Sequence, residues 1–537
     1  MAVTETPPET VEAASATVAS STPSQPTGLA AVLGSGDHKV IGRLYLASAL
    51  LFGALVVGLG EAFAIEGVAP KTLDVFSADT AYQLFTLARV GSVFLLALPL
   101  VIGIAMIVVP LQVGARTIAF PRAAAASYWG WLLGAALLIA SYAMNGGPGG
   151  GSTEGVNLWI ASMGLLVLSV LLAAVCLATT VFALRPPGLY LSRLPLFAWS
   201  VLVASLMWLL TLPVLFAMIV IMYVDHRHAG GIFLGSPAAL YPSLTWFFRN
   251  PQIYVVAIPV LGFVGDVLGT VSGARMKLRS VAHGSIALFG IVSFGAFLVA
   301  SSAEVMESGF VVIMSLVAVL PLLGLAAVCA DQFRLGTFKL RAGVVYAIAA
   351  FLILLLGVAA GAVGTLPGIL DAPEGGTVSD NIFFVGVGNA VLLAAVIAAL
   401  GGIHWWATKA GRQPANEKLG MLAPLLLLVG AALAVIPDLA SGLAGKGLEL
   451  NADFTGGIAG LNGVVAAGIA ITGLGVLVAV ISYLPLFKRS EDDVPADPWG
   501  GSTLEWLAPS PTPLANFVDD LPVITSAEPL IDLREEK

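Results

Sequence analysis

The sequence predicts an all-α integral membrane protein with twelve transmembrane helices. Of its 537 residues, 58% are hydrophobic and only 10% are charged, whereas about 25% of the residues in a soluble domain carry a charge. Apolar segments recur along almost the whole chain, and each has roughly the 20 residues that a helix needs to cross a bilayer. Basic residues collect in alternate loops between these segments. One membrane domain is therefore expected at 37–489, between tails at 1–36 and 490–537.

Each predicted span is long enough to cross the hydrocarbon core as a single helix. The spans lie near residues 41–64, 84–110, 124–144, 157–184, 195–223, 245–269, 281–301, 309–330, 343–366, 382–406, 419–437 and 457–485. Glycine and alanine are frequent in them, as in the stretches 164–178 and 463–475. Small residues let helices approach closely where lipid supplies no hydrophobic drive between them, so this composition indicates packing rather than a site.

The distribution of Lys and Arg predicts how the chain is oriented, because basic residues stay preferentially in cytoplasmic loops. The richer loops alternate along the chain and carry Arg116 and Arg122, Arg185 and Arg193, Arg275, Lys277 and Arg279, Arg334, Lys339 and Arg341, and Lys409, Arg412 and Lys418. A multi-pass protein of the cell inner (plasma) membrane is expected, with both termini in the cytoplasm. The lipid bilayer is its expected partner, and no basic run indicates a nucleic acid.

The two tails differ from the membrane domain in composition. Residues 1–36 are rich in Thr, Ser, Pro and Ala and lack the apolar core of a signal peptide, so a disordered cytoplasmic tail is expected. Residues 490–537 form an acidic, Pro-rich cytoplasmic tail with too little apolar surface to fold alone. The two cysteines, Cys176 and Cys329, lie inside apolar segments and are expected to be buried and reduced.

Seven stretches, in this order and spacing, resemble subunit I of the haem-copper oxidases of the cytochrome c oxidase type. They are DHKVIGRLYL from Asp37, AYQLFTL from Ala81, VPLQVGARTIAFPR from Val109, PGLYLSRLPLFAWSVLV from Pro187, WFFRNPQIYVVAIPVLG from Trp246, GRQPANEKLG from Gly411 and DPWGGSTLEWLAPSPTP from Asp497. The resemblance runs from residue 37 into the C-terminal tail. It implies the twelve-helix fold of that subunit and, by default, aerobic electron transfer to oxygen with proton pumping.

The metal ligands that the resemblance implies are absent from this sequence. In the family, histidines hold a low-spin haem, a high-spin haem and a copper ion. The positions that match the haem ligands hold Ala88, Gly386 and Gly388, and the positions that match the copper ligands hold Asn250, Ser301 and Ser302. In the His-Pro-Glu-x-Tyr pattern the glutamate has become Gln252, and only Tyr254 is retained. Glycine, alanine and serine cannot replace an axial imidazole, so neither haem nor copper is expected.

The proton routes that the resemblance implies are depleted as well. The acidic residue of the family's GARD pattern is Thr117 here, and no lysine occurs between Phe310 and Ala330. The arginine pair that would hold haem propionates is replaced by Lys446 and Gly447. Losing the metal ligands together with both proton routes argues against a single shift of alignment.

Arg89 lies inside the second predicted span, where an unpaired cation is costly by a few kcal/mol. Glu304 or Glu307 is its expected partner. Asn250, Gln252 and Asn389 are the other polar side chains expected near it. This cluster either fills the volume left by the haems or binds an anionic ligand. Bulky side chains are also expected to fill that volume, and the candidates are Phe294, Phe297, Phe383, Phe384 and Trp246.

Three functions remain open from these observations. The leading hypothesis is a non-catalytic, structural, assembly or regulatory subunit associated with the respiratory chain, which keeps the scaffold and possible contacts with other oxidase subunits. The second is a catalytic terminal oxidase with atypical metal ligands. The third is a transporter or small-molecule receptor that uses the vacated haem cavity. A fold does not carry a function, so the site has to decide between them.

Overall fold

The computed structural model describes residues 29–68, 78–148, 150–228, 237–299, 303–306, 308–372, 378, 381–447, 457–488 and 494–536. The chain separates into two units, Met1–Ser35 and Gly36–Lys537. The first unit contributes one described helix, α1 (Leu29–Leu33). The second unit contains 12 described helices that are long and apolar enough to cross a membrane. The predicted all-α fold with twelve transmembrane helices is therefore confirmed.

The spans follow the predicted apolar segments closely. They are α2 (His38–Glu66), α4 (Ala78–Gly91) continued by the π-helical turn η1 (Ser92–Ala97) and α5 (Leu98–Gln112), α6 (Pro121–Ala143), α7 (Thr153–Ala183), α8 (Leu196–His228), α9 (Pro237–Ser272), α10 (Arg279–Phe297), α12 (Gly309–Val317) continued by α13 (Val319–Leu335), α14 (Ala342–Gly364), α15 (Ile382–Trp405), α17 (Glu417–Leu443) and α18 (Gly457–Ser482). Among the described residues, six short elements lie between the spans or after the last of them. They are η2 (Leu191–Arg193), α11 (Ala303–Met306), α16 (Ala407–Ala410), η4 (Leu484–Phe487), η5 (Leu504–Leu507) and α19 (Pro529–Glu535).

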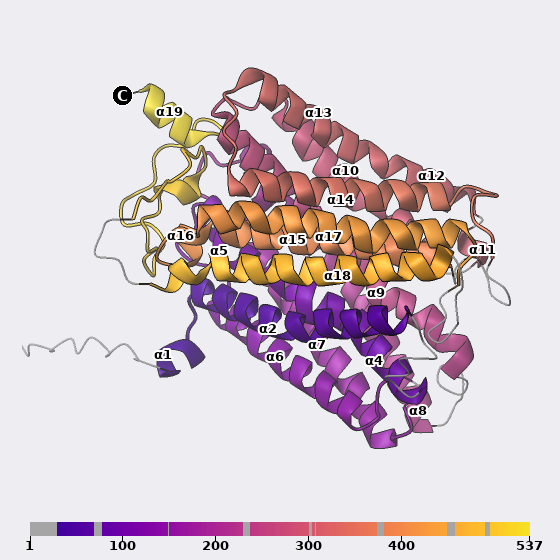
Figure 1. Ribbon diagram of the computed structural model, residues 1–537. Coiled ribbons are helices and arrows are strands. Elements are labelled where there is room, and N and C mark those ends of the chain that lie inside the picture. The colour runs from indigo at the N-terminus through magenta and orange to yellow at the C-terminus, as the bar shows by residue number, and fades with distance from the viewer. Residues whose placement is uncertain are drawn as a thin grey trace, which may run out of the picture. The chain divides into compact units, whose positions relative to one another are not determined.

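Three spans form the centre of the bundle. The most apolar windows of the α4–η1–α5 span and of α9 are each 89% buried, and that of α15 is 83% buried, whereas that of α18 is only 22% buried. Helix α9 packs against α15, α4 and η1. The spans of the bundle run roughly parallel to one another in Figure 1. The described positions that match the family's metal ligands, Ala88, Asn250, Gly386 and Gly388, lie on these three spans, at the centre of the fold.

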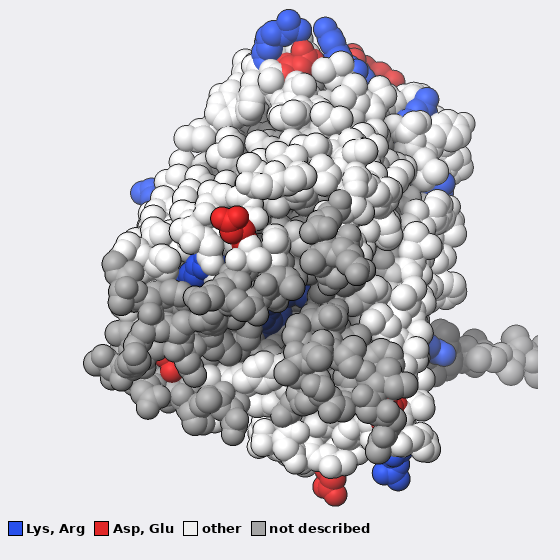
Figure 2. All heavy atoms as spheres, turned by 90° about the vertical axis from the view of Figure 1, so that its right-hand side faces the viewer, with Lys and Arg blue, Asp and Glu red and all other residues white. Residues whose placement is uncertain are grey.

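The outer walls of the bundle are apolar. Large hydrophobic side chains point outward from several spans, for example Leu51 at 72% exposed, Leu210 at 68% and Ile291 at 66%. Figure 2 shows a described surface that is mostly neither basic nor acidic. Such walls suit contact with lipid. Cys176 and Cys329 are buried and unpaired, which confirms the prediction for both thiols.

Residues 494–536 are packed against one end of the bundle, at the left of Figure 1, and we call them the C-terminal strap. Trp506, Ile524 and Leu530 of the strap are buried. Asn516 is fully buried and accepts hydrogen bonds from Lys39 Nζ at 2.9 Å, with His38 Nε2 3.0 Å away. The strap has little regular structure of its own, so its order comes from contacts with the bundle.

Candidate functional site

The described positions expected at the site lie on three spans, of which α9 packs against both α4 and α15. Ala88 and Arg89 lie on α4, Asn250, Gln252 and Tyr254 lie on α9, and Gly386, Gly388 and Asn389 lie on α15. Ser301, Ser302 and Glu307 lie outside the described residues. Glu304 belongs to α11, but its side chain, like that of Trp246, is outside the described part. The expected pairing of Arg89 with Glu304 or Glu307 therefore stays a prediction.

Gly388 faces the side chain of Arg249. A β-carbon added at Gly388 would lie 2.9 Å from Arg249 Nη1 and 3.7 Å from Ile253 Cδ1. A distance of 2.9 Å is shorter than ordinary van der Waals contact, so a larger residue at Gly388 requires the guanidinium to move. A guanidinium thus lies where a ligand side chain from this position of α15 would begin.

Among the described residues, Arg249 has one hydrogen-bond partner, and that partner is neutral. Its Nη2 donates to Asn389 Oδ1 at 2.7 Å, and the residue is 6% exposed. Its Nε has no hydrogen-bond partner among the described residues. Arg249 also lies within electrostatic reach of Arg89, whose guanidinium stacks over the Phe85 ring at 5.4 Å. The site therefore combines two cationic side chains with an amide.

Arg249 was not singled out in the sequence analysis, although the signal for it was present. It stands in the WFFRNPQIY stretch, within a span of otherwise apolar character. The argument that identified Arg89 applies to it equally, because any cation inside a span is a functional suspect. Its position next to Gly388 depends on the packing of α9 against α15, which no single stretch of sequence contains.

Gly386 points to another neighbour, helix α17. A β-carbon at Gly386 would lie 3.1 Å from Asp438 Cβ and 3.2 Å from Leu439 Cδ2. Asp438 is 9% exposed and interacts electrostatically with Lys446, which donates to Asn462 Oδ1 at 2.6 Å. Burial lowers the pKa of Lys446, and the nearby Asp438 opposes that change. The two glycines of α15 thus face different helices, and side chains occupy the space beside both.

The expected site residues Asn250, Gln252 and Tyr254 of α9 differ in their contacts with described residues. Asn250 Nδ2 donates to the carbonyl of Val299 at 3.1 Å. Gln252 is fully buried, and neither its oxygen nor its nitrogen has a partner among the described residues. Tyr254 is 3% exposed, with its ring centroid 6.5 Å from that of Phe297.

The aromatic side chains expected to fill the site are placed differently from one another. Phe297 is 2% exposed and lies beside Tyr254. Phe383 and Phe384 are also buried and pack near Gly364 of α14. The prediction is wrong for Phe294, which is 44% exposed because it lies on an outward side of α10. A separate apolar cavity of about 10 Å³ lies between α5, α9 and α15, lined by Val101, Val260 and Ala399 among others. It has room for about one water molecule at most.

The donor chemistry of the described residues does not suit a haem or a copper ion. Histidine, cysteine, aspartate and glutamate form no group of three or more that could hold a metal within the described ranges. His38, His283 and His404 lie near the strap end of the bundle, where they are buried in hydrogen bonds to protein groups. His226 and His228 close α8. The described residues at the positions that match the metal ligands, and the polar residues beside them, therefore offer amide and guanidinium groups rather than axial ligands.

The sequence matches a known protein family. The family described as cytochrome C and quinol oxidase polypeptide I matches residues 40–477. The probable cytochrome c oxidase subunit 1-beta of Nocardia farcinica is 30% identical over 527 residues, covering 93% of this chain and 87% of that protein. Cytochrome bo(3) ubiquinol oxidase subunit 1 of Buchnera aphidicola is 28% identical, covering 90% of this chain and 76% of that protein.

A solved structure shares the fold. The cryo-EM structure of a heme-copper terminal oxidase dimer superposes with a TM-score of 0.65 at 14% identity, over 90% of this chain and 88% of that one.

Proposed function

Because the chain belongs to the cytochrome c and quinol oxidase polypeptide I family, we propose that it is a non-catalytic member that has lost haem and copper binding. It keeps the subunit I scaffold and serves a structural, assembly or regulatory role in the respiratory chain. Its apolar walls and twelve spans make it a multi-pass membrane protein, and we infer the plasma membrane with both termini in the cytoplasm from the basic loops.

One observation carries this proposal. The guanidinium of Arg249 lies 2.9 Å from where a β-carbon of Gly388 would be, and it bonds to Asn389 on the same helix. A histidine at position 388 would place its imidazole against the buried guanidinium of Arg249. A cation beside a ferric or cupric ion is electrostatically unfavourable in a medium of low dielectric constant. This arrangement supports a site organised around a positive side chain instead of a metal.

Oxygen consumption tests the absence of catalysis. The purified chain, supplied with reduced cytochrome c or with a quinol, is expected to consume oxygen no faster than the detergent blank. An active haem-copper oxidase assayed in the same detergent is the positive control. Cyanide-sensitive turnover above the blank would establish the alternative, a terminal oxidase with atypical ligands.

The position of Arg249 also favours a second candidate, an anion-binding receptor or transporter. Arg249 is 6% exposed, and its Nε has no partner within the described part of the chain. A buried guanidinium stays charged and gains most from a compact anion in bidentate contact. In a thermal unfolding assay, chloride would then stabilise the protein relative to gluconate, and Arg249→Gln would remove the difference. Equal stability in both salts would reject this candidate.

A further inference from the structure

Two buried carboxyl groups share one amide at the strap end of the bundle. Gln112, the last residue of α5, directs Nε2 to Asp266 Oδ2 of α9 at 2.9 Å and to Glu505 Oε1 of the strap at 3.1 Å. Gln112 is fully buried and Glu505 is 1% exposed. The orientation of the amide is determined, because Gln112 Oε1 accepts from the backbone N–H of Ala198 at 3.0 Å. Both hydrogens of the nitrogen therefore go to the carboxyl groups, one to each.

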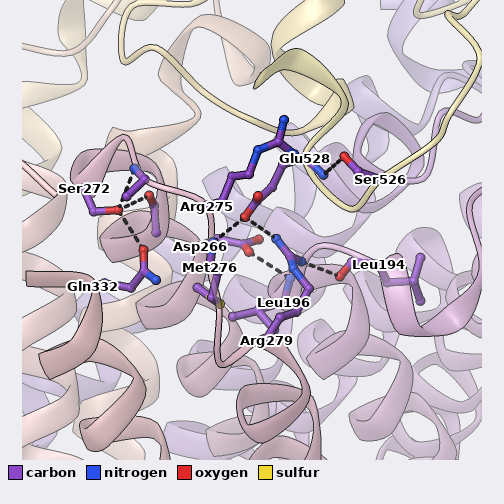
Figure 3. A network of polar contacts seen from close by, with 12 residues as sticks. Leu194, Leu196, Asp266, Ser272, Arg275, Met276, Arg279, Gln332, Ser526 and Glu528 are labelled. Atoms are coloured by element: carbon purple, nitrogen blue, oxygen red, sulfur yellow. Dashed lines mark hydrogen bonds and ion pairs between the residues drawn. The ribbon is translucent and has the colours of Figure 1, made fainter. Parts of the chain in front are cut away.

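Asp266 is arranged to carry the negative charge of the pair. Its two oxygens accept backbone N–H groups at the start of α8, from Leu196 at 2.8 Å and from Phe197 at 3.0 Å, and Figure 3 shows Asp266 beside Leu196. The N-terminus of a long helix favours an anion. Arg279 of α10, which bonds to Leu194 and Glu528, lies within electrostatic reach of Asp266 as well.

Glu505 has a different environment. Its Oε2 has no hydrogen-bond partner among the described residues, and no described ion pair includes it. Burial, followed by the charge of Asp266, raises the pKa of Glu505 to about 7. Lys409 of α16 lies within electrostatic reach of Glu505 and binds the strap through the carbonyl oxygens of Ala496 and Ala508 and the hydroxyl of Ser510. Lys409 also faces Asp497. The protons of Lys409 Nζ are thus directed to these carbonyl and hydroxyl oxygens rather than to Glu505.

We propose that Asp266 and Glu505 hold a single proton between them, on Glu505, and that release of this proton loosens the C-terminal strap from the bundle. The proton leaves the Glu505 carboxyl group for water at the strap end. Two buried carboxylates then face each other across the one amide of Gln112. Separation of the strap relieves this repulsion, because Glu505 belongs to the strap and Asp266 belongs to α9.

The sign of the effect follows from the pKa of each group. The pKa of Glu505 is higher in the docked state, so docking is favoured at low pH and weakens as the pH rises from about 4.5 towards 7. Lys409 acts in the opposite sense over a higher range, because burial lowers its pKa to about 8 and docking therefore strengthens above that pH. The strap should be held least firmly between about pH 7 and pH 8.

Hydrogen–deuterium exchange on the full-length protein in detergent tests the proposal. After correction for intrinsic exchange, the opening equilibrium of residues 494–536 should rise on the order of tenfold or more between pH 5 and pH 7.5. Glu505→Gln should abolish this rise. Asp519→Asn is the matched control, because Asp519 is an exposed carboxylate of the same strap, and it should leave the rise unchanged. A rise that persists in Glu505→Gln overturns the proposal.

A measurement on the unaltered chain covers the case in which Glu505→Gln does not fold. Infrared difference spectra between pH 6 and pH 8 should lose the carbonyl stretch of a buried protonated carboxyl group, in parallel with the increase in exchange of the strap. A spectrum without such a band would contradict the shared proton. The result is independent of haem content, so it stands or fails separately from the proposed function.

Discussion

At the scale of single residues, the candidate site is defined by the contact between Gly388 and Arg249. Gly388 lacks a side chain, and the guanidinium of Arg249 from the neighbouring helix occupies the space next to where a β-carbon would lie. The guanidinium is the far end of a long side chain and could withdraw from a new methyl group, but withdrawal would strain or break its hydrogen bond to Asn389 in a buried site. This close approach makes position 388 sensitive to any increase in size.

Gly388→Ala is therefore expected to destabilise the protein by about 1–3 kcal/mol through overpacking, measured by thermal unfolding in detergent. Adding Arg249→Met should recover part of the loss, because it removes the atom that the methyl group would meet. Gly58→Ala on α2 is the control, since a β-carbon at Gly58 meets nothing within 4 Å. Equal destabilisation by both alanine variants would contradict the assigned contact.

Asn516 supports a second prediction at this scale. It has a left-handed backbone with φ of 66°, and its side chain joins His38, Lys39 and the carbonyl of Ala115. Asn516→Ala loses the hydrogen bonds and also places alanine in an unfavourable conformation, whereas Asn516→Gly loses the bonds alone. We expect both variants to lower the melting temperature and the free energy of unfolding. Asn516→Ala should lower the free energy of unfolding by about 1 kcal/mol more than Asn516→Gly does. The opposite order would show that the backbone conformation is different.

At the scale of elements, α19 is held on the bundle by charge. Arg275 of the loop before α10 bonds to Asp532 at 2.6 Å and to Glu535 at 2.7 Å. The two carboxylates raise the pKa of Arg275, and hydrogen bonds from Ser526 and Arg275 hold the pKa of Asp532 below its usual range despite partial burial. These contacts join a terminal segment of seven residues, too short to be stable as a helix alone, to the bundle.

Acid is therefore expected to detach α19. The pKa of Asp532 is lowered, so its contribution is complete above the unfolded value of about 3.9 and is lost as the pH falls through the lower folded value. Proteolysis near residue 530 should become faster below about pH 4 in the native protein. Asp532→Asn should already be cleaved fast at neutral pH, and its cleavage rate should change little as the pH falls. A native protein whose cleavage rate does not depend on pH over this range would exclude the ionic attachment.

At the scale of the whole molecule, the length and apolar character of segments predicted the spans, but contacts between distant segments could not be predicted. The segment near 382–406 became α15 at Ile382–Trp405, because about 20 apolar residues have few alternatives to a membrane helix. The pairing of Asn516 with His38 joins residues 478 positions apart. The contact of Arg249 with Gly388 likewise depends on which faces of α9 and α15 meet, and periodicity does not determine that for helices that are apolar all round.

Twelve spans place both ends of the membrane domain on one side of the bilayer. A reporter fused after Lys537 and one inserted after Gly230 should therefore report opposite sides, with the first in the cytoplasm because the basic loops stay there. Reports from the same side would reject this topology.

Haem content is the most direct test of the central claim that this scaffold has given up its metals. The chain, purified from cells that supply haem and copper to an active oxidase expressed in parallel, should show no haem in the pyridine haemochrome assay and no copper in stoichiometric amount by elemental analysis. Its reduced-minus-oxidised visible spectrum should be flat. One haem per chain, with a reducible band in that spectrum, would contradict the account.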